Sequence, residues 1–284
     1  MNSISPVRPS PIAGSWYSAD AHKLSSELNR YLDAATLPNL PGRIVGLIAP
    51  HAGYMYSGPT AAYAYRAVRG LKFDLCVVVS PLHQYLPYSL ITSAHKAYTT
   101  PLGNVEIDLK LVDSFQKALS GAGLETVHPI ANDREHSLEI QLPFLQCALT
   151  DGFKLLPLMI RSADPLFLQQ TALVLSKVLP RSGVLLVAST DLSHFYNESS
   201  ANQLDAVMLS QMSNFSAEGV LQAEKDQTGF ACGSGAVALV LWLSKFMGAE
   251  HVTLLHHDTS ASTSGDHSSV VGYGSLAITT SEGN

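Results

Sequence analysis

The sequence predicts a single α/β domain over residues 1–284, with a central, mostly parallel or mixed sheet and helices on both of its faces. Short β-rich runs alternate along the chain with amphipathic stretches of helical period, which is typical of such a sheet. Two runs, at 75–79 and 184–187, are apolar at every position, so we expect both faces of these strands to be buried. Apolar residues make up 46% of the chain and charged residues 14%, which is enough for a sizeable core.

The individual elements follow from the same alternation, read in chain order. We expect strands at 43–48, 75–80, 153–160, 184–189, 252–255 and 270–278. We expect helices at 21–34, 59–68, 109–119, 137–149, 165–178, 202–212 and 235–246. A small, polar stretch at 260–269 is loop-like, but no linker or repeat interrupts the alternation, so no domain boundary is expected.

Composition excludes several classes of function. The net charge is −6 and the Lys and Arg residues are scattered, so we expect no nucleic-acid partner. The sequence has neither a signal-peptide pattern nor an apolar run of membrane-spanning length, which predicts a cytoplasmic protein without a membrane partner. The three cysteines cannot all pair within one chain, and we expect reduced thiols, with Cys76 and Cys147 packed as apolar residues.

Polar residues follow three of the predicted strands. His51 comes after the first strand, His83 after the second, and Asp191 and His194 after the strand that ends at 189. In open α/β sheets, ligands bind in the crevice beyond the carboxyl ends of the strands. A single histidine is more often a surface or core residue than a ligand, and only this shared position predicts one common site.

Asp191 and His194 are three residues apart. A short helical turn after the strand would bring both side chains to the same side, as an acid/base pair or a pair of ligands. The alternative is that Asp191 caps a helix through its carboxylate. Both interpretations can hold together.

Cys232 lies in a loop of small residues, 230–236, that opens an apolar helix. Backbone amides and the helix dipole would favour a thiolate there, so the thiol is a candidate ligand or redox centre. At 133–139, helix capping competes with catalysis, and we expect Glu135 and His136 to lie behind the ligands. Residues 256–258 (His-His-Asp) are left out of the site, because neighbouring residues of a strand face opposite ways.

Four ordered motifs, at 13–17, 49–54, 135–139 and 269–273, resemble the Memo family, which includes AmmeMemoRadiSam system protein B. The resemblance covers almost the whole chain. It implies a fold similar to that of class III extradiol dioxygenase catalytic subunits, in which two histidines and a carboxylate hold ferrous iron.

The resemblance also implies roles for individual residues. His51 and His83 match the two histidine ligands, and Cys232 falls where the family has cysteine in place of the carboxylate. Asp191 and His194 match the remaining motif positions of the pocket, with a catalytic role. A thiolate is softer than a carboxylate, so iron or copper is the expected cofactor.

Several functions fit this pattern. The leading hypothesis is a metal-binding redox protein with iron or copper held by His51, His83 and Cys232. A non-haem iron, extradiol dioxygenase-like oxidoreductase and a zinc hydrolase are alternative enzymes. From another class, the resemblance suggests a non-enzymatic module that binds a peptide or a partner protein. The partner, a small molecule or a protein, stays open.

Overall fold

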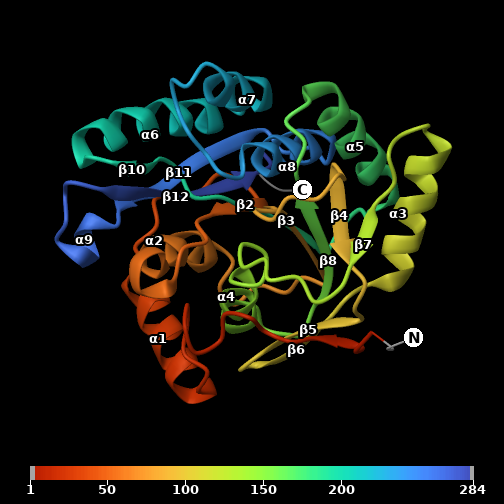
Figure 1. Cartoon of the computed structure of the whole chain (residues 1–284), viewed down its shortest axis with the longest axis horizontal. Helices are drawn as coiled ribbons and strands as arrows, with labels where there is room; N and C mark the ends of the chain where they lie inside the picture. Colours follow the sequence, from red (N-terminus) through yellow and green to blue (C-terminus); the bar gives the residue numbers. More distant parts are fainter. Residues whose placement is uncertain (1–3, 282–284) are drawn as a thin grey trace.

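Four parallel strands lie side by side at the centre of the main sheet in the computed structural model, which describes residues 4–281 (Figure 1). Their order is β2 (Ile44–Ala49), β9 (Val184–Ser189), β3 (Leu75–Pro81) and β8 (Lys154–Ile160). Every residue of these four strands is buried except Lys154, the first residue of β8, as expected for strands that are covered on both faces.

Antiparallel strands extend this sheet on both sides. β12 (Val270–Thr279) runs antiparallel to β2, and both β10 (His194–Tyr196) and β11 (His251–Thr259) pair with it. On the other side, β4 (Leu90–Ser93) runs antiparallel to β8, and β7 (His128–Ile130) pairs in parallel with β4. The sheet is mixed, which confirms the predicted fold class.

Two hydrophobic cores lie on opposite faces of the sheet. Successive side chains of β3 alternate between them: Val77 and Val79 enter one core, Cys76 and Val78 the other. The first core is covered by α3 (Leu109–Gly121), α5 (Pro165–Val178), α6 (Glu198–Ser213), α7 (Ala217–Lys225) and α8 (Ser234–Phe246). The second is covered by α1 (Ala21–Ala34), α2 (Tyr54–Ala67) and α4 (Gln141–Ala148), while the short α9 (Ala261–Ser264) lies outside both.

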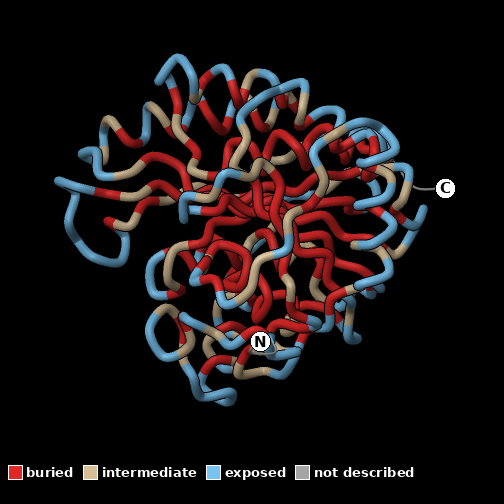
Figure 2. Tube along the Cα trace, turned by 45° about the vertical axis from the view of Figure 1, so that its right-hand side comes forward, coloured by how far each residue is buried: buried red, intermediate tan, exposed pale blue. Residues whose placement is uncertain are grey.

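The buried residues gather at the centre of the molecule (Figure 2). Within residues 4–281, no helix is both long and apolar enough to cross a membrane.

A separate three-stranded sheet, which the sequence did not predict, lies at the bottom of Figure 1. Its order is β1 (Val7–Arg8), β5 (Ala97–Thr100) and β6 (Gly103–Glu106), and β1 pairs in parallel with β5. This pairing fixes the amino-terminal arm beside residues 133–139, which Arg8 contacts.

Helix α2 begins at Tyr54, so the expected start at Pro59 is wrong. Pro59 removes one hydrogen bond within the helix. Contacts with other elements nevertheless hold the first turn. The Tyr54 ring packs edge-on against Phe144, with centroids 5.0 Å apart, and the Tyr54 hydroxyl donates to the Ile140 carbonyl at 2.5 Å. Tertiary packing therefore outweighs the local proline signal.

Candidate metal centre

The carboxyl ends of neighbouring strands bring the predicted residues together. His51, His83 and Asp191 each lie two residues beyond the end of a central strand: β2, β3 and β9 respectively. β2 and β9 pair in register, with Ala49 opposite Ser189, so His51 and Asp191 leave the sheet at the same level. The ends of β2 and β9 therefore place His51 and Asp191 at the same edge of the sheet, and the common site of these residues with His83 and His194 stays a prediction.

Three imidazole rings form what we call the histidine cluster: His51, His83 and His136. One ring nitrogen from each lies within 4.8 Å of the other two. The ring centroids of His51 and His83 are 5.4 Å apart and nearly perpendicular, whereas those of His83 and His136 are 4.8 Å apart and nearly parallel. Two nitrogens bound to one ion lie about 3–4 Å apart for metal–nitrogen bonds of about 2.0–2.1 Å. A small inward movement of the rings would suffice to hold an ion.

The ring of His136 lies in this cluster, although the sequence suggested a position behind the ligands. Trp16 packs on its outer side, with ring centroids 4.1 Å apart. The neighbouring Glu135 was the one feature of the sequence that could have indicated this role of His136, because a carboxylate beside a histidine is common at metal sites. The direction of the ring depends on the path of residues 131–140, which have little regular structure.

The hydrogen bonds around His51 determine which of its ring nitrogens carries the proton. The Ser189 hydroxyl donates its one proton to the Ser137 carbonyl at 2.6 Å and accepts from the Gln141 amide at 2.7 Å. Ser189 Oγ must therefore accept from His51 Nδ1, 3.0 Å away. This leaves Nε2 of His51 without a proton, so its lone pair can serve a ligand.

Glu135 lies behind His83 and holds it. Its Oε2 accepts the His83 backbone N–H at 2.6 Å, and its Oε1 lies 3.0 Å from His83 Nδ1. Oε1 also accepts the backbone N–H groups of His136 and Ser137 at 3.0 and 2.9 Å. One carboxylate thus positions two members of the cluster, and Nε2 of His83 is left for an ion.

The cluster is electrostatically uneven. Burial lowers the pKa of His51 to about 3, and the nearby His83 adds to this effect. Burial likewise lowers the pKa of His136 to about 4. The hydrogen bond to Glu135 instead raises the pKa of His83. Burial alone would raise the pKa of Glu135, but the hydrogen bonds from His83 and Ser137 hold it well below its usual range.

Cys232 lies beside the histidine cluster. Its Sγ is 3.2 Å from His51 Nε2 and accepts the Asp191 backbone N–H at 3.3 Å. Burial and the Asp191 carboxyl raise the pKa of this thiol, so the metal-free protein carries a thiol rather than the thiolate expected from the helix dipole. Gly233 is required next to it, because a Cβ there would overlap the Ser189 carbonyl oxygen. The set of His51, His83 and Cys232 as metal ligands stays a prediction.

The expected helical turn between Asp191 and His194 is absent. The Leu192 N–H donates to the Gly272 carbonyl, and the Gly272 N–H donates to the Ser193 carbonyl, so this segment pairs with β12 instead of coiling. Asp191 caps no helix; its Oδ1 accepts the His51 N–H at 2.6 Å.

The two side chains have different hydrogen-bond partners, although the charge of His194 acts to lower the pKa of Asp191. The Oδ2 of Asp191 lies 4.0 Å from His51 Nε2, and burial raises the pKa of this carboxyl. His194 Nδ1 donates to the Leu192 carbonyl at 2.8 Å. Their catalytic roles stay a prediction.

A groove of about 470 Å³ adjoins the cluster through Trp16 and Ala52. Aromatic side chains line much of it, among them Tyr56, Phe195 and Tyr273. Phe195 has a left-handed backbone, with φ of 64°, and three quarters of its surface is exposed. Such strain in a non-glycine residue is concentrated at functional sites.

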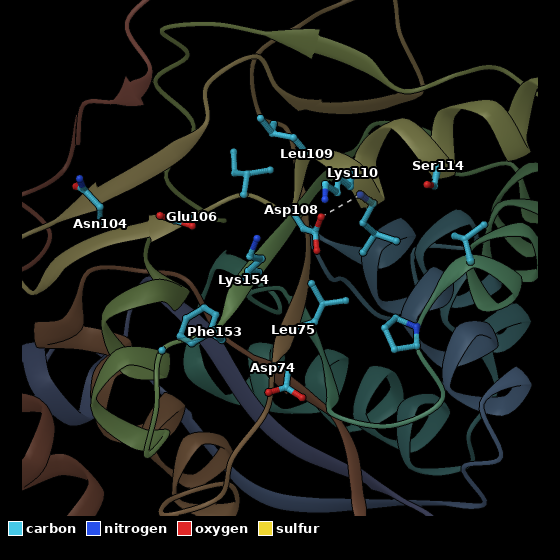
Figure 3. A pocket seen from close by; sticks show the side chains of 15 residues that line it. Asp74, Leu75, Asn104, Glu106, Asp108, Leu109, Lys110, Ser114, Phe153 and Lys154 are labelled. Carbon is cyan, nitrogen blue, oxygen red and sulfur yellow. Dashed lines mark hydrogen bonds between the residues drawn. The ribbon is translucent and has the colours of Figure 1, made fainter.

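Another cavity, of about 1030 Å³, lies elsewhere (Figure 3). It is lined by the starts of β3 and β8, at Leu75 and Lys154, and so lies at the opposite edge of the sheet from the histidine cluster. The charged groups that face it, such as Asp74 and Glu106, are exposed to solvent. It is not part of the candidate centre.

The two histidines left out of the site, His256 and His257, have other partners. His256 stacks on Tyr63, with centroids 4.1 Å apart, and His257 Nε2 bonds to Asp205 at 2.9 Å. All three cysteines are free; Cys76 is buried and Cys147 half-buried.

Comparison with known proteins gives the same family as the motifs. A family model described as "Memo-like protein" matches residues 8–277. The chain belongs to the Memo family. A "MEMO1 family protein" of Ignicoccus hospitalis is 34% identical over 287 residues, and one of Nitrosopumilus maritimus is 30% identical over 275 residues. Each alignment covers 95% of this chain and 98% of the relative.

Among solved structures, this Memo-family chain is similar to an uncharacterized protein, JW3007, from Escherichia coli K12. The identity is 14% and the TM-score 0.46, with 83% of this chain and 99% of that one covered.

Proposed function

We propose that this protein holds iron or copper at the histidine cluster and uses the bound ion in a redox reaction on a small molecule. The observation that carries the proposal is the convergence of three ring nitrogens, from His51, His83 and His136, within 4.8 Å of one another. Imidazole nitrogen is a ligand that suits iron, copper and zinc.

The state of the ligands fits an ion of this kind. The low pKa values of His51 and His136 keep both rings neutral at physiological pH, so their lone pairs need no deprotonation before an ion binds. The pairing of His83 with the Glu135 carboxylate is a common arrangement behind metal-binding histidines.

Cys232 supports a redox metal over a hard cation. A sulfur atom 3.2 Å from His51 Nε2 is close enough to share an ion with that nitrogen, and a soft donor favours copper or thiolate-tolerant iron over magnesium or calcium. When bound, such an ion supplies electron transfer or Lewis acidity. We assign proton movement to the side chains of Asp191 and His194.

The aromatic groove supports a small organic molecule as the ligand. Its volume of about 470 Å³ lies within the range of small-molecule sites, and Trp16 links it to the ring of His136. A peptide side chain is the competing occupant.

Anaerobic purification followed by elemental analysis tests the proposal first. Iron or copper near one ion per chain is expected, together with oxygen uptake when a reductant is supplied. His83→Gln removes the most exposed member of the cluster, so the fold should survive while the ion is lost; His267→Gln, at an exposed ion pair with Glu198, is the control. Zinc without redox activity would overturn the redox role, and a protein that binds no ion would overturn the centre itself.

A further inference from the structure

Arg8 is a deeply buried cation at the start of the chain, with 1% of its surface exposed. Its Nε and Nη2 donate to the two carboxylate oxygens of Asp133 at 3.0 and 2.7 Å, and its Nη1 donates to Glu139 Oε2 at 2.5 Å. The same Nη2 also donates to the backbone carbonyl of Glu135 at 2.7 Å. A buried guanidinium is tolerated only when its donors are satisfied in this way.

These contacts hold the backbone of Glu135 on both sides. Arg8 binds its carbonyl directly, and Asp133 Oδ1, which Arg8 also holds, accepts the Glu135 N–H at 3.1 Å. The Glu135 carboxylate in turn contacts His83 and the backbone of His136. An unbroken series of hydrogen bonds therefore runs from β1 to the histidine cluster.

A second tie joins the same two segments. The ring of His95 is fully buried, and its Nδ1 donates to the Ser5 carbonyl at 2.7 Å. Its Nε2 accepts the N–H of Asn132 at 3.0 Å, where the backbone is left-handed with φ of 54°. One imidazole thus fixes both the amino-terminal arm and the entry to the loop that carries Glu135.

We propose that Arg8 is a positioning residue for the histidine cluster, acting through Asp133 and the backbone of Glu135 on the orientation of His83 and His136. The forked guanidinium is essential to this role, because it reaches a carboxylate and a carbonyl at once. Lysine would keep the charge but lose the fork. For metal affinity the inference rests on the proposed function.

Arg8→Lys in the full-length protein is the test, with Co²⁺ titrated anaerobically as the probe. We expect a folded variant whose affinity for Co²⁺ falls about tenfold, the lower end of the effect of changing an outer partner of a metal ligand. Arg69→Lys, at a pair with Asp33, is the matched control and should bind Co²⁺ like the parent. A folded Arg8→Lys variant with the parent's affinity would overturn the proposal.

A second readout needs no metal. In the metal-free parent at alkaline pH, nitrogen NMR of the histidine rings should show His83 with its proton on Nδ1, because Glu135 accepts from that atom. Arg8→Lys should populate both tautomers. If the parent binds no Co²⁺, the proposed function fails, yet this spectrum still decides the role of Arg8: an unchanged His83 signal rules it out.

The ion pair between Arg8 and Glu139 allows the positioning role of Arg8 to be tested separately from its contribution to stability. Glu139 Oε1 accepts from Ser10 and Tyr17, away from Glu135, so Glu139→Gln should lower the unfolding midpoint and leave Co²⁺ affinity near the parent value. Asp133→Asn should lower the affinity as Arg8→Lys does. Equal losses of affinity in Glu139→Gln and Asp133→Asn would show that burial alone is responsible and would overturn the assignment.

Discussion

The carboxylate of Glu135 contacts His83 twice, at the backbone N–H with Oε2 and at ring Nδ1 with Oε1. Both contacts are made by a residue 52 positions further along the chain, on a loop that has no strand or helix of its own. This one side chain therefore fixes both the backbone and the ring of His83, which is the least buried member of the cluster.

Glu135→Gln should lower metal affinity by about 10–100-fold. Both oxygens of the carboxylate accept hydrogen bonds from N–H groups, and the NH₂ group of glutamine cannot replace one of them. Isothermal titration of the metal-free proteins with Co²⁺ measures the change. Glu198→Gln, at the exposed pair with His267, serves as a control with the same chemical change. Equal affinities for the parent and Glu135→Gln would contradict the role given to Glu135.

The third ligand can be identified by comparing two variants. His136→Gln should reduce affinity for both Fe²⁺ and Cu⁺ by more than about 100-fold, because a lost ligand costs more than a lost outer partner. Cys232→Ser should weaken Cu⁺ binding much more than Fe²⁺ binding, since sulfur is the softer donor. Competition with coloured chelators measures both affinities without oxygen.

Cys232→Asp extends the comparison, because a carboxylate beside two histidines should shift preference towards Fe²⁺. Parent-like affinities in both Cys232 variants would remove Cys232 from the centre. They would leave the histidine cluster intact.

The metal-free protein should lose stability as the pH falls below about 6.5. The unfolded chain then protonates His51 and His136, while the folded chain, with pKa values of about 3 and 4, does not. The stabilisation from these two rings is complete above the unfolded pKa and declines towards the folded values. Each ring accounts for about 2 kcal/mol between pH 7 and pH 5, at 1.36 kcal/mol per pKa unit.

Comparison with a variant isolates this effect, because the raised pKa of His83 acts in the opposite direction. With a chelator present, the unfolding free energy of the parent relative to His136→Gln should shrink by about 2 kcal/mol from pH 7 to pH 5. Denaturant titrations at the two pH values measure it. A difference that does not vary with pH would show that His136 is not buried as a neutral ring.

Gly272→Ala should destabilise the protein by roughly 1–3 kcal/mol or more, as overpacking does. A Cβ at this position would overlap Asp205 Oδ2, and Asp205 is fully buried. A Cβ added at Gly121, at the end of α3, would have nothing within 4 Å of it, so Gly121→Ala should instead stabilise slightly. Thermal unfolding of the two variants gives opposite signs if the packing is as described.

The central strands could be predicted because burial on both faces leaves a local signal. Strand 184–189 is observed with the predicted bounds. The short strands β4 to β7 were missed because their formation depends on their partners and not on their own sequence. β1, with two residues, exists only through its pairing with β5.

Those parts of the candidate site that directly follow a predicted strand could be predicted from the sequence. His51 and His83 follow runs that are plainly β, so their convergence could be inferred. The position of His136 depends on contacts with Arg8, which lies more than 120 residues earlier in the sequence, and no local pattern shows them. The state of Cys232 depends on burial, which outweighs the effect of the helix start that the sequence suggested.

The register between β2 and β9 makes the candidate metal centre sensitive to the number of residues between each strand and its ligand. Ala49 and Ser189 are paired, and His51 and Asp191 each follow after one intervening residue. One residue added to either connection would turn a side chain away from its partner, whereas the turns before β3 and β8 open at the opposite edge of the sheet. Relatives that keep this centre should therefore vary in length at that opposite edge and tolerate no insertion between strand and ligand.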